Sequence, residues 1–269
     1  MRSSGEMKII SLNIWDLPVW FVKDRKERIV LIKDFLITLN PDIICLQESF
    51  DPDHRAEIIS FFQTHGYAAS DKHVGSRNVI GRKMDTTGGL VTFSKFPILA
   101  NSFIPFPRLF FSPIEWLGRK GVLMTLLDTP YGKLRMINVH LSKGFLYPEA
   151  VRLRQLKHLF IHVQSLSPVF TCIAGDFDQQ DFVHNRKFSE LITKHNFIHP
   201  PGDTIKPSYR AENKYVDIWM NRIRHSKRLD YIVYNHLGSL HVAVEQYAVI
   251  YLDKPLSDHD PVLLDFRQE

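Results

Sequence analysis

The chain has 269 residues, of which 44% are hydrophobic and 23% are charged, and its formal net charge is +5. This balance excludes a disordered or collagen-like chain and is typical of a globular protein with a sizeable core. The modest positive charge is compatible with an anionic ligand but does not by itself indicate a nucleic-acid-binding protein.

Strands and helices are predicted to mix along the whole chain. Apolar runs predict strands at residues 7–14, 42–48, 67–70, 88–94, from 96 onward, 121–127, 134–140, 169–174, 229–234, 240–250 and 262–266. Helices are predicted at about residues 24–39, 52–65, 148–166 and 181–195. Residues 74–87 and 199–224 are expected to be irregular, and the prolines of residues 103–118 to block regular pairing. This mixture indicates one α/β domain with central sheets, whose core covers about residues 7–267.

Cysteine use and the N-terminus bear on the compartment. Cys45 and Cys172 lie in apolar runs, so both are expected to be free, buried thiols, and a reducing compartment is the default. The polar residues 1–6 lack a signal-type apolar core, and no apolar run approaches the roughly 20 residues that cross a bilayer. We therefore expect a cytoplasmic or peripheral membrane protein, and a monomer.

Polar side chains stand at the ends of the predicted strands, far apart in sequence. They are Asn13, Glu48, His140, Asp176, Asp178, Asp230, Asp258 and His259. Each alone has an ordinary explanation, such as a turn cap, a surface charge or an Asx turn. Because strand ends in layered α/β folds can share one edge, where ligands commonly bind, we expect these side chains to lie together.

The residue types in this set favour one kind of chemistry. Carboxylate and amide oxygens are ligands for Mg²⁺ or Mn²⁺, and the lack of a cysteine cluster argues against a closed zinc site. An aspartate beside His259 can orient its ring as a general base. Metal, base and anion-stabilising donors together fit the hydrolysis of a phosphate ester.

The ordered motifs resemble the endonuclease/exonuclease/phosphatase superfamily of Mg²⁺-dependent phosphoesterases. The matching segments are Leu12–Trp15, Leu46–Glu48, Gly88–Lys95, Asn138–Leu141, Gly175–Asp178, Arg228–Tyr231 and Ser257–His259. Within the superfamily the chain looks most like the neutral sphingomyelinase branch. The segments that carry this finer resemblance are Asn13–Pro18, Ser94–Ile98, Gly118–Gly121, Arg228–Tyr234 and Leu256–His259.

The resemblance implies a four-layered α/β sandwich, in which two mixed β-sheets pack face to face and are flanked by helices. It implies Mg²⁺, with Mn²⁺ as a substitute, bound by Glu48 together with Asn13 and Asp258. It also implies His259 as the residue that activates water and Asp230 as the residue that orients it. His140 would contact the phosphate, and Asp176 would act near the nucleophile or the leaving group.

Asp178 departs from the superfamily pattern, which usually has Asn at this position. Asn donates a hydrogen bond to phosphate, whereas an ionised Asp only accepts. A carboxylate beside a phosphoryl oxygen repels it unless the carboxylate is protonated or bound to metal. We hypothesise that Asp178 weakens activity, shifts its pH optimum or serves a second metal, and that Asp178→Asn raises activity.

Two aromatic segments, residues 15–21 and 103–111, leave two interpretations open. They can insert into a bilayer interface or pack onto the sheets as core or lid. The aromatic residues proposed for the membrane or substrate loops are Trp15, Trp20, Phe110 and Phe111. Under the membrane interpretation, Arg108, Arg119 and Lys120 meet the headgroups.

Three functions follow from the sequence. The first is a Mg²⁺-dependent phosphodiesterase acting on a phospholipid headgroup, with sphingomyelin foremost. The second is a DNA or RNA nuclease or DNA-end phosphodiesterase, for which Arg77, Arg82 and Lys83 form only a modest basic cluster. The third is a non-catalytic binding protein on the same fold, with Asp178 as a sign of lost activity.

Overall fold

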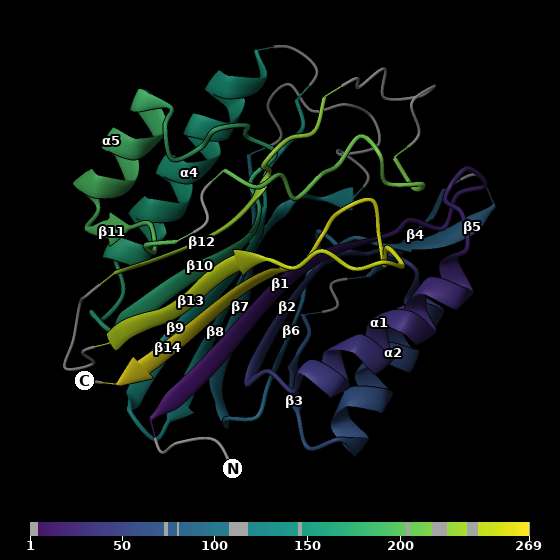
Figure 1. Cartoon of the computed structure of the whole chain (residues 1–269), viewed down its shortest axis with the longest axis horizontal. Helices are drawn as coiled ribbons and strands as arrows, with labels where there is room; N and C mark the ends of the chain where they lie inside the picture. Colours follow the sequence, from purple (N-terminus) through teal and green to yellow (C-terminus); the bar gives the residue numbers. More distant parts are fainter. Residues whose placement is uncertain are drawn as a thin grey trace.

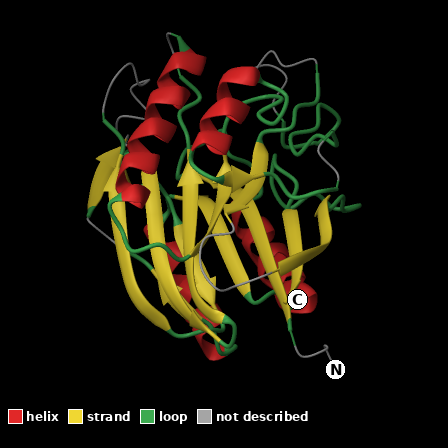
Figure 2. Ribbon diagram, turned by 90° about the vertical axis from the view of Figure 1, so that its left-hand side faces the viewer, coloured by secondary structure: helices red, strands yellow, loops and turns green. Residues whose placement is uncertain are grey.

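The computed structural model describes residues 5–72, 75–79, 81–107, 118–144, 147–202, 205–216, 225–235 and 242–268. Within these residues, two six-stranded sheets lie against each other, and helices cover the outer face of each (Figure 1). Figure 2, turned by 90°, shows the strands in the middle with helices on both sides. This arrangement is the four-layered α/β sandwich that the motifs imply.

The first sheet contains the N-terminal and C-terminal strands. Its order is β13 (Val242–Val249), β14 (Val262–Gln268), β1 (Glu6–Asp16), β2 (Ile43–Ser49), β6 (Val91–Ser94) and β3 (Ala68–Ser70). Strand β1 is parallel to β2 and antiparallel to β14, so the sheet is mixed. Helices α1 (Arg25–Leu39) and α2 (Pro52–Thr64) cover its outer face through one apolar cluster (Figure 1).

The second sheet is built from the middle of the chain. Its order is β11 (Phe197–Ile198), β12 (Asp230–Asn235), β10 (Phe170–Asp176), β9 (Gly132–His140), β8 (Gly121–Thr129) and β7 (Ile98–Pro105). Strands β9 and β10 are parallel, and the other pairings are antiparallel. Helices α4 (Pro148–Gln164) and α5 (Arg186–Lys194) cover its outer face (Figure 1).

The core between the sheets explains the continuous apolar runs in the sequence. Ile9 and Cys45 from the first sheet pack with Phe170 and Cys172 from the second. Both cysteines are buried and free, as expected. Because side chains on both faces of the central strands are buried, the sequences of these strands are nearly continuously apolar and do not alternate between apolar and polar residues.

Four local predictions were wrong. Residues 74–87 contain a hairpin, β4 (Ser76–Val79) and β5 (Arg82–Asp85), which the polar sequence concealed. Strand β7 continues to Pro105, because an edge strand tolerates a proline. Helix α5 begins at Arg186 rather than near residue 181, since the side chain of Asn185 caps it by accepting from the Lys187 amide. The two-residue strand β11 was not predicted.

No helix among the described residues combines the length and hydropathy needed to span a bilayer.

Candidate active site

Strand register brings the predicted polar residues to one edge of the sandwich. In the second sheet, Asp176 pairs with His140 on the parallel strand β9 and with Asp230 on the antiparallel strand β12. In the first sheet, the parallel strands β1 and β2 end together, with Asn13 opposite Gln47 and next to Glu48. Asp176 is therefore the central residue of the edge.

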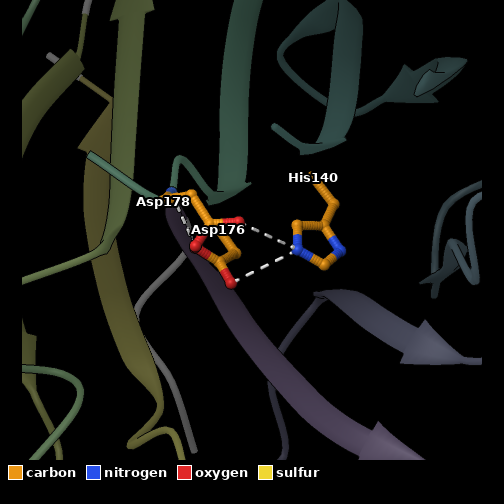
Figure 3. Close-up of side chains that lie close together, drawn as sticks. All are labelled: His140, Asp176 and Asp178. Atoms are coloured by element: carbon orange, nitrogen blue, oxygen red, sulfur yellow. Dashed lines mark hydrogen bonds and ion pairs between the residues drawn. The ribbon is translucent and has the colours of Figure 1, made fainter. Parts of the chain in front are cut away.

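Two groups of potential ligand atoms share Asp176. His140, Asp176 and Asp178 form one group, and Asp176, Asp230 and His259 form the other; within each group the ligand atoms lie within 4.8 Å of one another. Figure 3 shows the first group, with the His140 ring facing both carboxylates. His140 Nε2 is 3.5 Å from Asp176 Oδ2 and 3.5 Å from Asp178 Oδ2.

His259 and Asp230 form a buried hydrogen-bonded pair. His259 Nδ1 is 2.7 Å from Asp230 Oδ2, and the Ser208 hydroxyl donates to the same oxygen at 2.6 Å. His259 Nε2 points toward Asp176 Oδ2, 3.7 Å away. Burial acts to lower the pKa of His259, but Asp230, Asp176 and the neighbouring Asp258 outweigh it and raise this pKa well above 6.5. The surrounding carboxylates therefore stabilise the protonated form of the His259 ring.

Asp176 is fixed by hydrogen bonds from both sheets. Asn13 Nδ2 donates to Asp176 Oδ2 at 3.0 Å, and the backbone amide of Asp178 donates to Asp176 Oδ1 at 2.8 Å. Asn13 Oδ1 in turn accepts from the Trp15 amide. Burial and the nearby Asp178 raise the pKa of Asp176 to about 7. This carboxyl can therefore exchange a proton near neutral pH.

Glu48 and Asp258 offer carboxylate oxygens suited to a hard divalent cation. Glu48 Oε2 is buried and has no hydrogen-bond partner among the described residues, while Glu48 Oε1 lies 3.8 Å from His140 Nε2. Burial raises the pKa of Asp258 to about 6, and the negative charge of Glu48 adds to this rise. A buried Asp258 whose charge is disfavoured, next to an unpartnered oxygen of Glu48, is a setting that a divalent cation stabilises, so these residues fit Mg²⁺.

The backbone at Glu48 is strained. Glu48 has a φ of 57°, in the left-handed region that non-glycine residues rarely adopt. The loop that contains Gly89 packs closely against this backbone. A Cβ atom at position 89 would lie only 3.0 Å from Glu48 Cα, so the contact favours glycine. The Gly88-Gly89 motif therefore allows close backbone contact with the end of β2 at Glu48.

Lys120 is a site residue whose place the sequence prediction missed. It was expected to meet lipid headgroups, but it is only 6% exposed, because the chain entering β8 turns it into the edge. Its Nζ lies 2.7 Å from His140 Nε2, donates to the Leu141 carbonyl at 2.6 Å and pairs with Asp178 Oδ2 at 3.1 Å. The motif Gly118–Gly121 was the available signal, but its spacing does not show burial.

Lys120 changes the interpretation of Asp178. Burial acts to raise the pKa of Asp178, but the Lys120 ammonium and His140 outweigh it and hold this pKa well below its usual range. The charge of Asp178 is therefore compensated within the protein, by a lysine that the sequence had suggested for contact with lipid headgroups. Ser208, which supports Asp230, was also missed, because residues 199–224 carry no regular pattern.

The four aromatic residues proposed for substrate or membrane contact differ in exposure. Trp20 is 83% exposed and lies edge-on to the partly buried Phe21. Trp15 is half-buried, with the Arg28 guanidinium 5.2 Å from its ring. Phe110 and Phe111, like Arg108, lie outside the described residues, and Arg119 is half-buried.

One relative is the inositol phosphosphingolipids phospholipase C of Schizosaccharomyces pombe, which is 31% identical over 151 residues. The aligned region is 54% of this chain and 33% of the relative, so the chain matches about a third of the relative's length.

Three solved structures share the fold. A beta-toxin variant from Staphylococcus aureus with bound magnesium ions has a TM-score of 0.75 at 16% identity, covering 98% of this chain and 100% of its own. Sphingomyelinase C from Streptomyces griseocarneus has a TM-score of 0.71 at 16% identity, covering 97% of this chain and 99% of its own. D. rerio TDP2 with a single-stranded DNA product has a TM-score of 0.70 at 15% identity, covering 97% of this chain and 99% of its own.

The sequence model of the Endonuclease/Exonuclease/phosphatase family matches residues 11–259, a range that includes every predicted site residue. The chain therefore belongs to the endonuclease/exonuclease/phosphatase family, as its motifs predicted.

Proposed function

We propose that the chain is a Mg²⁺-dependent phosphodiesterase that hydrolyses the phosphate ester of a phospholipid headgroup, with sphingomyelin or a related sphingolipid as the first candidate. The observation that carries the reaction type is the buried Asp230–His259 pair, which faces Asp176 at the same edge as the unpartnered oxygen of Glu48. The substrate class is supported by the phosphosphingolipid phospholipase relative and by the sphingomyelinase neighbour.

His259 acts as the general base in this proposal. Its Nε2 is free of Asp230 and takes a proton from the attacking water, while Nδ1 stays hydrogen-bonded to Asp230 Oδ2. Asp230 fixes the ring and stabilises the imidazolium that forms. Ser208 holds Asp230 in place through three contacts, because its hydroxyl donates to Oδ2 and accepts from the amides of Leu229 and Asp230.

The opposite side of Asp176 binds the phosphoryl group. Lys120 presents an ammonium beside His140, where negative charge grows on the phosphoryl oxygens in the transition state. Asp176, with a pKa of about 7, holds a proton that it can donate to the departing alkoxide. Mg²⁺ held by Glu48 and Asp258, with Asn13 beside them, would supply positive charge to a phosphoryl oxygen.

The loop between β1 and α1 supports contact with a membrane surface. Trp20 is exposed on this loop, which follows the end of β1, the strand that carries Asn13. An exposed indole is suited to the interface of a bilayer, where its ring contacts apolar chains and its N–H contacts water. We include peripheral membrane association in the proposed function on this ground.

A nuclease is the second candidate, favoured by the likeness to TDP2 with its DNA product. Arg77, Arg82 and Lys83 are all exposed on the β4–β5 hairpin, where they could contact a nucleic-acid backbone. The binding-protein alternative loses its main argument, because Lys120 compensates the charge of Asp178.

A hydrolysis panel tests these proposals. The substrates are sphingomyelin, an inositol phosphosphingolipid, lysophospholipids, phosphoinositides, abasic DNA and single-stranded RNA, each assayed with Mg²⁺ and with excess EDTA. We expect Mg²⁺-dependent release of the sphingolipid headgroup, and loss of about 10²- to 10⁴-fold in His259→Ala. Cleavage of nucleic acid alone would select the nuclease, and hydrolysis that survives His259→Ala would refute the proposed base.

A further inference from the structure

We infer that buried arginines behind the active edge, Arg28 foremost, are positioning residues that hold the strand ends carrying the proposed metal ligands and base. The inference rests on the proposed function for the meaning of that site. Arg28, Arg55 and Arg152 are 1%, 3% and 8% exposed, and each donates to main-chain carbonyls in the last residues of a strand that bears a site residue, or just past its end.

Arg28 joins two segments that are distant in sequence. From helix α1 it donates through Nη1 to the Ile14 carbonyl at 2.6 Å and through Nη2 to the Trp15 carbonyl at 2.9 Å, directly after Asn13. The same Nη1 reaches the Leu256 carbonyl at 3.4 Å, two residues before Asp258. One guanidinium thus fixes the spacing between Asn13 and Asp258.

Packing around Arg28 locks this arrangement. Its Nε donates to the Lys23 carbonyl at 3.0 Å, and the Trp15 and Tyr215 ring centroids each lie 5.2 Å from its Cζ. Arg28 therefore hydrogen-bonds to main-chain carbonyls and faces two aromatic rings, while the nearby carboxylates of Asp258 and Asp16 stabilise its buried charge. A guanidinium can serve several carbonyls at fixed angles, which the single ammonium of lysine cannot.

Arg55 and Arg152 repeat the pattern at two other strand ends. Arg55 donates to the Ser49 carbonyl at 2.9 Å and to the Leu90 carbonyl at 2.6 Å, which ties the residue after Glu48 to the Gly88-Gly89 loop. Arg152 donates to the carbonyl of Ser142 at 3.2 Å and to the Gln179 side chain at 3.0 Å. It thereby links the segment after His140 to the segment after Asp178.

The strand ends need such support because their backbones are strained. Trp15, Glu48 and Asp178 have φ values of 48°, 57° and 50°. Left-handed backbone at non-glycine residues costs about 1–3 kcal/mol each and persists only where surrounding contacts over-determine it. One of the three arginines donates a hydrogen bond to each strained residue or to the residue that follows it. Arg28 donates to Trp15 itself, Arg55 to the residue after Glu48, and Arg152 to the residue after Asp178.

Arg135 provides a matched control. It is 7% exposed and lies on β9, the strand that ends at His140, but near the other end of that strand. The one side-chain hydrogen bond of Arg135 within the described part of the chain goes to the Ser167 carbonyl at 3.0 Å, just past helix α4. Replacing it removes a buried guanidinium without touching the active edge.

The experiment compares Arg28→Lys with Arg135→Lys in the full chain. Hydrogen–deuterium exchange measures the protection of the backbone amides. Calorimetric titration with Mg²⁺ alone measures the affinity of the site for the metal. In Arg28→Lys we expect faster exchange at residues 13–23 and 254–259, together with Mg²⁺ binding weakened by about 10- to 100-fold. In Arg135→Lys we expect both readouts to match the wild type, although its thermal stability also falls.

Exchange in Arg28→Lys that equals the wild type at both segments would overturn the inference, whatever the Mg²⁺ titration shows. A wild-type protein that binds no Mg²⁺ would instead count against the proposed function, and the exchange result would still decide the role of Arg28. If Arg28→Lys fails to fold, Arg152→Lys applies the same comparison to residues 141–144 and 178–179.

Discussion

The two clusters that share Asp176 are built with opposite arrangements of charge. On one side, the carboxylates of Asp230, Asp176 and Asp258 surround His259 and raise its pKa. On the other side, the Lys120 ammonium and His140 surround Asp178 and lower its pKa. The first side stabilises the protonated form of a histidine, whereas the second keeps a partly buried carboxylate ionised beside an ammonium. In the proposed mechanism, the first side transfers the proton and the second side binds the phosphate.

The largest effect is expected from Asp230→Asn, which removes the anion bonded to His259. Because Asp230 stabilises the imidazolium, its loss lowers the pKa of His259 and shifts the ascending limb of the pH–rate profile to lower pH. We expect kcat/KM to fall by about 10²- to 10⁴-fold, since the ring loses its orientation. The measurement is kcat/KM from pH 5 to 9 for both proteins. An unshifted limb would show that another group sets the pH dependence.

Lys120→Met tests the phosphate-binding side. The substitution removes the ammonium that touches His140 and Asp178, and leaves His140 as the remaining contact that stabilises the Asp178 carboxylate. We expect kcat to fall by about 10²- to 10³-fold, the range for losing one preorganised donor. Lys133→Met is the control, because Lys133 is exposed at the start of the same strand that ends at His140. Equal activities of the two variants would contradict the assignment.

A smaller effect is expected from Trp20→Glu, which places a charge on the exposed loop. We expect binding to sphingomyelin-containing vesicles to weaken by about tenfold, because an indole no longer enters the interface. Hydrolysis of a short-chain soluble substrate stays unchanged, since Trp20 contacts neither cluster. Co-sedimentation with vesicles measures the first effect and a soluble assay the second. Vesicle binding equal to that of the wild type would remove this loop from the membrane contact.

The sequence allowed the architecture and the members of the edge to be predicted, because each apolar run ends at a polar residue. Asp176 and Asp230 could be placed at strand ends from their neighbours alone. Their pairing opposite each other depends on strand order in the second sheet, which no local pattern contains. The hairpin β4–β5 was hidden for a related reason: its exposed residues lack the alternation that identifies a half-buried strand.

The partners of the site residues were harder to predict than the residues themselves. Lys120 reads as a surface cation in the sequence, since lysine is rarely buried without a partner. Its burial depends on Asp178, which is 58 positions away. Arg28 appears in the sequence as a polar residue within a helix, yet its contacts extend to Leu256, 228 positions away. Such long-range compensation of charge becomes visible only in three dimensions.

The smallest effect, and the sharpest test of the two-sided arrangement, is expected from Asp178→Asn. The amide keeps an oxygen that accepts from Lys120 and gains an N–H that can donate to phosphate. Because the negative charge is lost, the Lys120 ammonium acts more strongly on the phosphoryl group, and we expect kcat/KM to rise by about threefold, a gain of less than 1 kcal/mol. Thermal stability falls, since a buried cation loses its anionic partner.

The same substitution in a Lys120→Met background separates the two causes of this rise. If the gain comes from releasing Lys120, Asp178→Asn raises activity only when Lys120 is present. If the gain comes from removing repulsion between Asp178 and phosphate, the increase in kcat/KM is larger in the Lys120→Met background, where no ammonium at position 120 offsets that repulsion. A double-mutant cycle on kcat/KM measures the difference. A rate that is unchanged or lower across the pH range in the single variant would show that the carboxylate of Asp178 is itself required, as a ligand or as the partner that holds Lys120 in place.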